Sequence, residues 1–122
     1  MGDESIAYAM EQQLPGYFGE RGTLTVAAGL TQTLKSLALP LCGYSGLMLP
    51  VLEDVGLGER SAAGYFNLDS LLLYSSVCGT GLDTIPIPGD ASTSQITAIL
   101  TDVATLSIRL NKPLQSSVLL LP

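Results

Sequence analysis

The chain has 122 residues, enough for one domain, and its composition excludes several classes of protein. Hydrophobic residues make up 47% and charged residues 13%, which excludes a disordered chain because disorder needs low hydrophobicity and high charge. With five basic and 11 acidic residues the net charge is −6, so the chain lacks the basic surface that nucleic acids require. The absence of histidine excludes Ser-His-Asp and Cys-His catalysis and the usual zinc and haem sites.

Two helices are expected in the first third of the chain. Apolar side chains recur every four residues from 3 to 13, where Asp3 can cap the helix before a Pro-Gly pair ends it. The second helix covers residues 23–38, with Thr23 as its cap and a proline beyond its end. Its apolar stripe consists of Ala27, Leu30, Leu34 and Leu37.

The middle of the chain predicts a short buried strand and two more helices. The strand covers residues 41–49, and Pro50 then suits the start of a helix over residues 51–63. Asn67 is a good N-cap for a helix over residues 68–78, which a Gly-Thr-Gly sequence ends. The inner face of this helix is expected to contain Leu68, Leu71, Leu72 and Ser75.

An extended segment, a long helix and a final strand complete the order. Two prolines push residues 82–89 out of the helical region. A capping box, S-x-x-Q from Ser92, precedes a strongly periodic helix over residues 93–111. Residues 118–121 form an apolar strand without water-facing alternation, typical of a sheet covered on both faces. The order predicts a helix-rich α/β fold with about five helices and two or three short strands.

The two cysteines, Cys42 and Cys78, are expected to be free thiols. Two cysteines are too few for the disulfide framework of a small secreted domain. The first residues, MGDESIAY, lack the basic and apolar regions of a secretory signal, so we expect a cytoplasmic protein. The longest uncharged run, residues 36–52, contains two prolines and two glycines, and it is expected to be a buried segment that changes direction rather than a membrane span.

The irregular stretch over residues 77–90 carries a thiol and a carboxylate five residues apart. Cys78 would be a nucleophile and Asp83 its base. The other residues of this candidate ligand site are Gly79, Gly81 and Thr84. The competing interpretation is a glycine turn in which Asp83 caps backbone groups. It is favoured because no histidine can activate the thiol, and the negative end of a helix dipole opposes its reactivity.

A second candidate region is GYSGLMLPVLED, residues 43–54. Its carboxylates, Glu53 and Asp54, can bind a ligand or act as acid and base when their environments differ, and Tyr44 can face a cavity. In the competing interpretation the two acids complement a helix N-terminus and the tyrosine packs in the core. If these residues function, we expect them to cluster with Cys78 and Asp83. The sequence identifies no cofactor, metal or substrate.

Residues 42–54 and 68–90 together resemble the family known as domain of unknown function 711. The resemblance extends through residues 22–36 and 100–114, and therefore covers most of the chain. It implies a fold similar to the barrel of pyruvate formate-lyase-like glycyl-radical enzymes.

Enzymes of that barrel use a cysteine on an internal loop, so the resemblance implies a place for Cys78, although the glycyl-radical loop is missing. Full-length members are much longer, and no reaction is assigned to the family as a whole. The 122 residues are therefore expected to form one domain, a fragment or short relative of a larger α/β barrel.

Three kinds of function remain open from the sequence. The first is an enzyme-like small-molecule site at Cys78 and Asp83. The second is a structural module that forms homo-oligomers through apolar helix faces without catalysis. The third is ligand or cation binding without turnover. A dimer is expected because residues 23–38, 93–111 and 118–121 all present apolar surface that a monomer of this size cannot easily cover.

Overall fold

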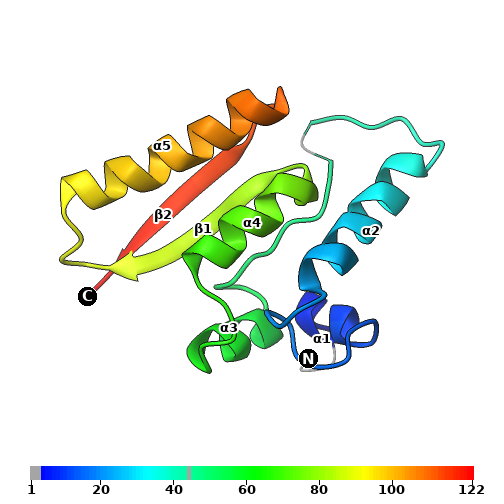
Figure 1. Cartoon of the computed structure of the whole chain (residues 1–122), viewed down its shortest axis with the longest axis horizontal. Coiled ribbons are helices and arrows are strands. Elements are labelled where there is room, and N and C mark those ends of the chain that lie inside the picture. The colour runs from blue at the N-terminus through cyan, green and yellow to red at the C-terminus, as the bar shows by residue number, and fades with distance from the viewer. Residues whose placement is uncertain (1–3, 44) are drawn as a thin grey trace.

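A computed structural model describes residues 4–43 and 45–122 and confirms the predicted helix-rich α/β fold. The elements are α1 (Ile6–Glu11), α2 (Thr23–Ser36), α3 (Val55–Ala62), α4 (Leu68–Cys78), β1 (Gly81–Pro88), α5 (Thr93–Leu110) and β2 (Gln115–Leu121). β1 and β2 pair in parallel, and α5 is the crossover helix between them. Figure 1 shows α4 beside β1 and α5 along β2, while α1 and α3 lie together at the other end of the molecule.

Helix α1 is shorter than predicted and has a different cap. The side chain of Ser5 accepts a hydrogen bond from the backbone N–H of Tyr8 at 3.3 Å and is the N-cap. The prediction that Asp3 caps this helix was wrong, and Asp3 itself lies outside the described residues.

Helix α2 begins where predicted, but Thr23 is its first helical residue rather than its cap. Gly22 precedes it with a φ of 105°, a conformation that favours glycine. The hydroxyl of Thr23 donates to the carbonyl of Glu20 at 2.8 Å and accepts from the N–H of Gly19 at 3.0 Å. It therefore fixes the preceding turn instead of the first turn of the helix.

The leucine stripe of α2 does not face the core. The buried residues of this helix are Thr23, Ala27 and Thr31. The three leucines of the predicted stripe are exposed: Leu30, Leu34 and Leu37. Small side chains let α2 lie against α4, and the larger leucines point away from it.

The described residues of the segment 41–49 do not form the predicted strand, because two glycines within it and a proline on each side break the chain direction. Among these described residues, only Leu47 makes a strand-like contact, a single parallel bridge to Gly79. Of the described residues in the uncharged run, the buried ones are in its second half, where Leu47, Leu49 and Val51 lie in the core. Helix α3 starts at Val55, later than predicted, because the backbone first turns around Pro50.

The capping signals of the two later helices are confirmed. Asn67 and Ser70 form a capping box at the start of α4, and Ser92 and Gln95 form another at the start of α5. Helix α4 ends at Gly79, whose φ of 92° allows the chain to turn directly into β1. Within the described part of the chain, no helix has the length and hydropathy needed to cross a membrane.

An aromatic cluster forms the centre of the core. Phe18 is fully buried, with its ring centroid 5.2 Å from that of Phe66 and 5.6 Å from that of Tyr74, both edge-on. Such edge-to-face pairs stabilise beyond the area they bury. The core continues beneath the sheet through Leu82, Ile85, Ile87 and Val103.

Replacing the central aromatic ring is expected to destabilise the fold strongly. F18A should lower the free energy of unfolding by about 3–5 kcal/mol, because it leaves a cavity among two other rings. L39A, at an exposed position, is the control and should change it by less than about 0.5 kcal/mol. Urea unfolding followed by circular dichroism, at one protein concentration, measures both. Equal effects would contradict this core assignment.

Candidate functional site

The turn between α4 and β1 joins three segments of the chain. The hydroxyl of Thr80 donates to the carbonyl of Leu47 at 2.8 Å, and the carbonyl of Thr80 accepts from the N–H of Gln115 at 2.8 Å. Gly79 and Gly81 both have positive φ, at 92° and 107°, so the turn requires glycine at the two sequence-predicted positions. The two glycine-rich regions therefore do meet, at Leu47 and Thr80.

Cys78 lies inside this turn and is only 1% exposed. Its sulfur accepts from the N–H of Gly81 at 3.4 Å and lies 3.6 Å from the hydroxyl of Thr80. A cavity lined in part by Gly81, Leu82 and Asp83 has a volume of about 10 Å³, room for about one water molecule. A substrate can therefore reach the thiol only if the turn opens. Both cysteines are free, as predicted, and Cys42 is exposed.

Asp83 and Thr84 form a local contact at the start of β1. The carboxylate of Asp83 accepts from the backbone N–H of Thr84 at 2.7 Å, and both residues are half-buried. This contact is the backbone-capping role that the competing sequence interpretation gave to Asp83. The catalytic role of Asp83 stays a prediction.

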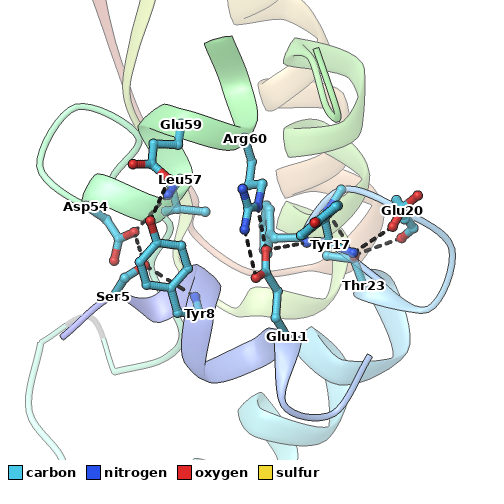
Figure 2. Close-up of polar contacts among 12 residues, drawn as sticks. Ser5, Tyr8, Glu11, Tyr17, Glu20, Thr23, Asp54, Leu57, Glu59 and Arg60 are labelled. Atoms are coloured by element: carbon cyan, nitrogen blue, oxygen red, sulfur yellow. Dashed lines mark hydrogen bonds and ion pairs between the residues drawn. The ribbon is translucent and has the colours of Figure 1, made fainter. Parts of the chain in front are cut away.

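The acidic pair divides into one exposed and one buried residue. Glu53 is exposed, whereas Asp54 is buried and is the N-cap of α3 (Figure 2). The carboxylate of Asp54 accepts from the N–H of Leu57 at 2.8 Å, from the hydroxyl of Ser5 at 2.6 Å and from the N–H of Ile6 at 2.5 Å. Tyr44, the third residue predicted in this region, lies outside the described residues.

These contacts make Asp54 a joint between the starts of α1 and α3. Burial acts to raise the pKa of the Asp54 carboxyl, but hydrogen bonds from Ser5 and from backbone N–H groups outweigh it and hold the pKa below its ordinary value. The carboxylate is therefore ionised at neutral pH. Its oxygens are directed at donors of two helices rather than at open space, which favours the helix-capping interpretation over ligand binding.

A second polar cluster joins α1 to α3, and the sequence did not reveal it. The guanidinium of Arg60 donates to both carboxylate oxygens of Glu11, at 2.7 and 3.0 Å (Figure 2). The same guanidinium lies 4.2 Å from the ring centroid of Tyr17 and 5.6 Å from that of Tyr8. The hydrogen bond from Arg60 lowers the pKa of Glu11. The pair is mostly buried, and the rings stack against its charged guanidinium.

The partners of this cluster are 49 residues apart in the chain, which is why no local pattern predicted it. The hint that the sequence offers is its composition. With five basic and 11 acidic residues, each arginine or lysine is expected to find an acidic partner, but the composition does not say which one. An open surface depression of about 600 Å³ lies nearby, lined in part by Glu20, Arg21 and Tyr65. Within the described residues, no three cysteine or acidic side chains are grouped so that they could hold a metal ion.

The fold and these clusters define a small α/β unit whose buried polar groups connect its own segments. The chain belongs to the family described as "Uncharacterised ACR (DUF711)", whose model matches residues 1–122. This match confirms the family predicted from the glycine-rich blocks.

Curated relatives carry the name UPF0210 protein. The chain is 44% identical to one from Pyrobaculum aerophilum over 115 residues, which are 91% of this chain and 26% of that protein. It is 32% identical to one from Listeria monocytogenes, with 89% of this chain and 25% of the relative covered. The chain thus spans about a quarter of the length of these relatives. No solved structure matches, so the similarity to glycyl-radical barrels stays a prediction.

The joint at Asp54 should make stability depend on pH. Because its folded-state pKa is lowered, its contribution is complete above its unfolded pKa of about 4 and is lost as the pH falls through the folded value. D54N should cost about 2 kcal/mol at pH 7, since the hydrogen bonds lose their charged acceptor, and less at pH 3. Urea unfolding at both pH values measures this difference. E53Q is the exposed control, and an unchanged D54N cost at pH 3 would contradict the assignment.

The burial of Cys78 predicts unequal thiol reactivity. In the native protein, iodoacetamide should label Cys42 readily and Cys78 at least about 100-fold more slowly, because the turn must open first. Both should react fully in urea. Peptide mass spectrometry against time gives the two rates. Similar native rates would show that the turn opens easily and would strengthen a reactive role for Cys78.

Proposed function

We propose that the chain is an assembly module, a structural unit that associates with a second copy of itself through apolar surface. The observation that carries this proposal is the exposure of three consecutive leucines in β2. Leu119, Leu120 and Leu121 are 43%, 48% and 42% exposed. Successive strand residues point to opposite faces of a sheet, so both faces are uncovered at this end of β2. A strand of this composition is normally covered on both sides.

Helices α2 and α5 add further apolar surface. On α5, Ile108 is 81% exposed and Leu100 is also exposed, and the leucine stripe of α2 faces outward. Burying one such side chain contributes about 1.5–3 kcal/mol, a large share of a domain stability of about 5–15 kcal/mol. Self-association would recover part of this free energy, while the net charge of −6 limits open-ended aggregation.

In the longer relatives we propose that the same surface packs against further polypeptide. The chain matches about a quarter of each of those proteins, so most of their length is available to cover it. A partial barrel-like unit of this kind would expose apolar strands and helix faces wherever neighbouring units are missing. The exposed leucines of β2 and α2 agree with this interpretation.

A small-molecule site at Cys78 and Asp83 is the second candidate. It is supported by the contact between Thr80 and Leu47, which brings two glycine-rich segments together, as predicted for a shared site. The geometry supports it less well than assembly, because the thiol is buried and the adjacent cavity holds about one water molecule. Its ligand would first have to open the turn.

Sedimentation equilibrium of the 122-residue chain tests the assembly proposal. We expect a reversible monomer–dimer equilibrium at micromolar concentration, tightened by added salt because salt screens the repulsion between two acidic copies. L34E places a charge in the exposed leucine stripe of α2. A weaker dimer of this variant would show that α2 is part of the interface. A monomer at every concentration up to about 1 mM would overturn the proposal.

A further inference from the structure

The two edges of the β1–β2 sheet differ in their ability to pair with another strand. In the observed register Pro86 lies opposite Leu119. In a parallel ladder, one member of each such pair makes both hydrogen bonds to the residues flanking its partner. Pro86 has no N–H, so Leu119 must make them: its N–H donates to Ile85, and its carbonyl accepts from Ile87.

The backbone groups of Pro86 and Pro88 consequently point away from β2, toward the other edge of β1. That edge offers carbonyls but lacks donors at the two prolines, so it cannot continue the ladder there. Just before β1 begins, Gly79 already forms a parallel bridge to Leu47. The edge of β1 is therefore closed to strand addition.

The edge of β2 is open. Because Leu119 and Leu121 use their backbone groups toward β1, those of Ser116, Val118 and Leu120 point outward. The strand carries no proline and no charged residue, the devices that normally protect an edge from pairing. Among the described strands β2 has β1 as its only partner. Its free edge presents both donors and acceptors.

From this edge we propose the geometry of the assembly: β2 pairs antiparallel with β2 of a second copy and forms a continuous four-stranded sheet. The inference rests on the proposed self-association and specifies its surface. A two-fold axis at Val118 pairs all seven residues of each strand, with Gln115 opposite Leu121. The outward-facing residues then pair with one another, Ser116 with Leu120 and Val118 with itself, which is the register that hydrogen bonding requires.

Charge at the strand ends favours the antiparallel orientation and a second copy as the occupant. Lys112 lies just before the start of β2. Asp90 lies in the turn after β1, next to Gly89, which is in close contact with the carbonyl of Leu121 at the end of β2. Antiparallel pairing brings Lys112 of each copy toward Asp90 of the other, at both ends of the interface. Parallel pairing would instead place like charges together.

The apolar side chains of β2 also find partners in this arrangement. Leu119 is placed opposite Ser117 of the other strand on one face of the sheet, and Leu120 opposite Ser116 on the other. The larger leucines thus alternate with small serines across the axis, which lets the strands approach without crowding.

Proline substitution at β2 tests the edge directly. L120P removes an outward N–H and adds a ring at the interface, but it should leave the β1–β2 ladder intact. L120A makes the same side-chain loss and keeps the N–H, so it is the matched control. Sedimentation equilibrium should show the dimer dissociation constant of L120P at least about tenfold above that of L120A. L119P, which removes a donor to β1, should lower the melting temperature more than L120P does.

A charge exchange tests the orientation with variants whose β2 backbone is unchanged. D90K and K112D should each weaken the dimer, and D90K/K112D should restore it, because each copy then again offers opposite charges to the other. If L120P and L120A dimerise equally, or if the double variant is no better than the single ones, the antiparallel β2 pairing is wrong. Should the wild-type chain be monomeric, the proposed function itself fails, whereas a dimer insensitive to L120P leaves that function in place on another surface.

Discussion

Two prolines in β1 determine which side of the sheet can grow. Pro86 and Pro88 lie opposite Leu119 and Leu121, and neither proline has a backbone N–H. The other residues of β1 therefore make the hydrogen bonds to β2, and the opposite edge of β1 lacks two N–H donors. The segments on either side of β1 are arranged around this strand. Before it, the turn at Thr80 contacts the Leu47 segment. After it, α5 crosses back so that β2 can pair with β1 in parallel. The open edge of β2 is the consequence at the surface.

Buried polar groups in this molecule hold separate segments together. Asp54 connects the starts of α1 and α3, Arg60 and Glu11 connect the same two helices further along, and Thr80 ties the α4–β1 turn to residue 47 and to β2. The carboxylates of Asp54 and Glu11 and the hydroxyl of Thr80 all direct their hydrogen bonds at protein groups, so these groups stabilise the structure. Cys78 is likewise enclosed by its own turn, with 1% of its surface exposed and its sulfur accepting from the N–H of Gly81.

Local signals in the sequence predicted the elements whose ends depend on neighbouring residues. The N-cap at Asn67, the capping box from Ser92 and the prolines of β1 correctly placed α4, α5 and β1, whereas the apolar run over residues 118–121 marked only the second half of β2, which begins at Gln115. Periodicity failed for α2, because it identifies an apolar stripe without saying what covers it: the leucines face outward, and the helix packs through Ala27 and Thr31. Contacts between distant residues, such as Arg60 with Glu11, left no pattern to detect. For the site, composition and helix polarity predicted a structural turn at Asp83, whereas the burial of the thiol needed the structure.

The free edge of β2 is the proposed interface between two copies of the chain. Isotope-filtered NMR on a mixture of labelled and unlabelled chains observes only contacts between copies. Antiparallel pairing about Val118 predicts a strong intermolecular contact between the Hα atoms of Ser117 and Leu119, a pair that faces across the strands without hydrogen bonds and is therefore close. Intermolecular contacts confined to α2 or α5, with none from β2, would contradict the account.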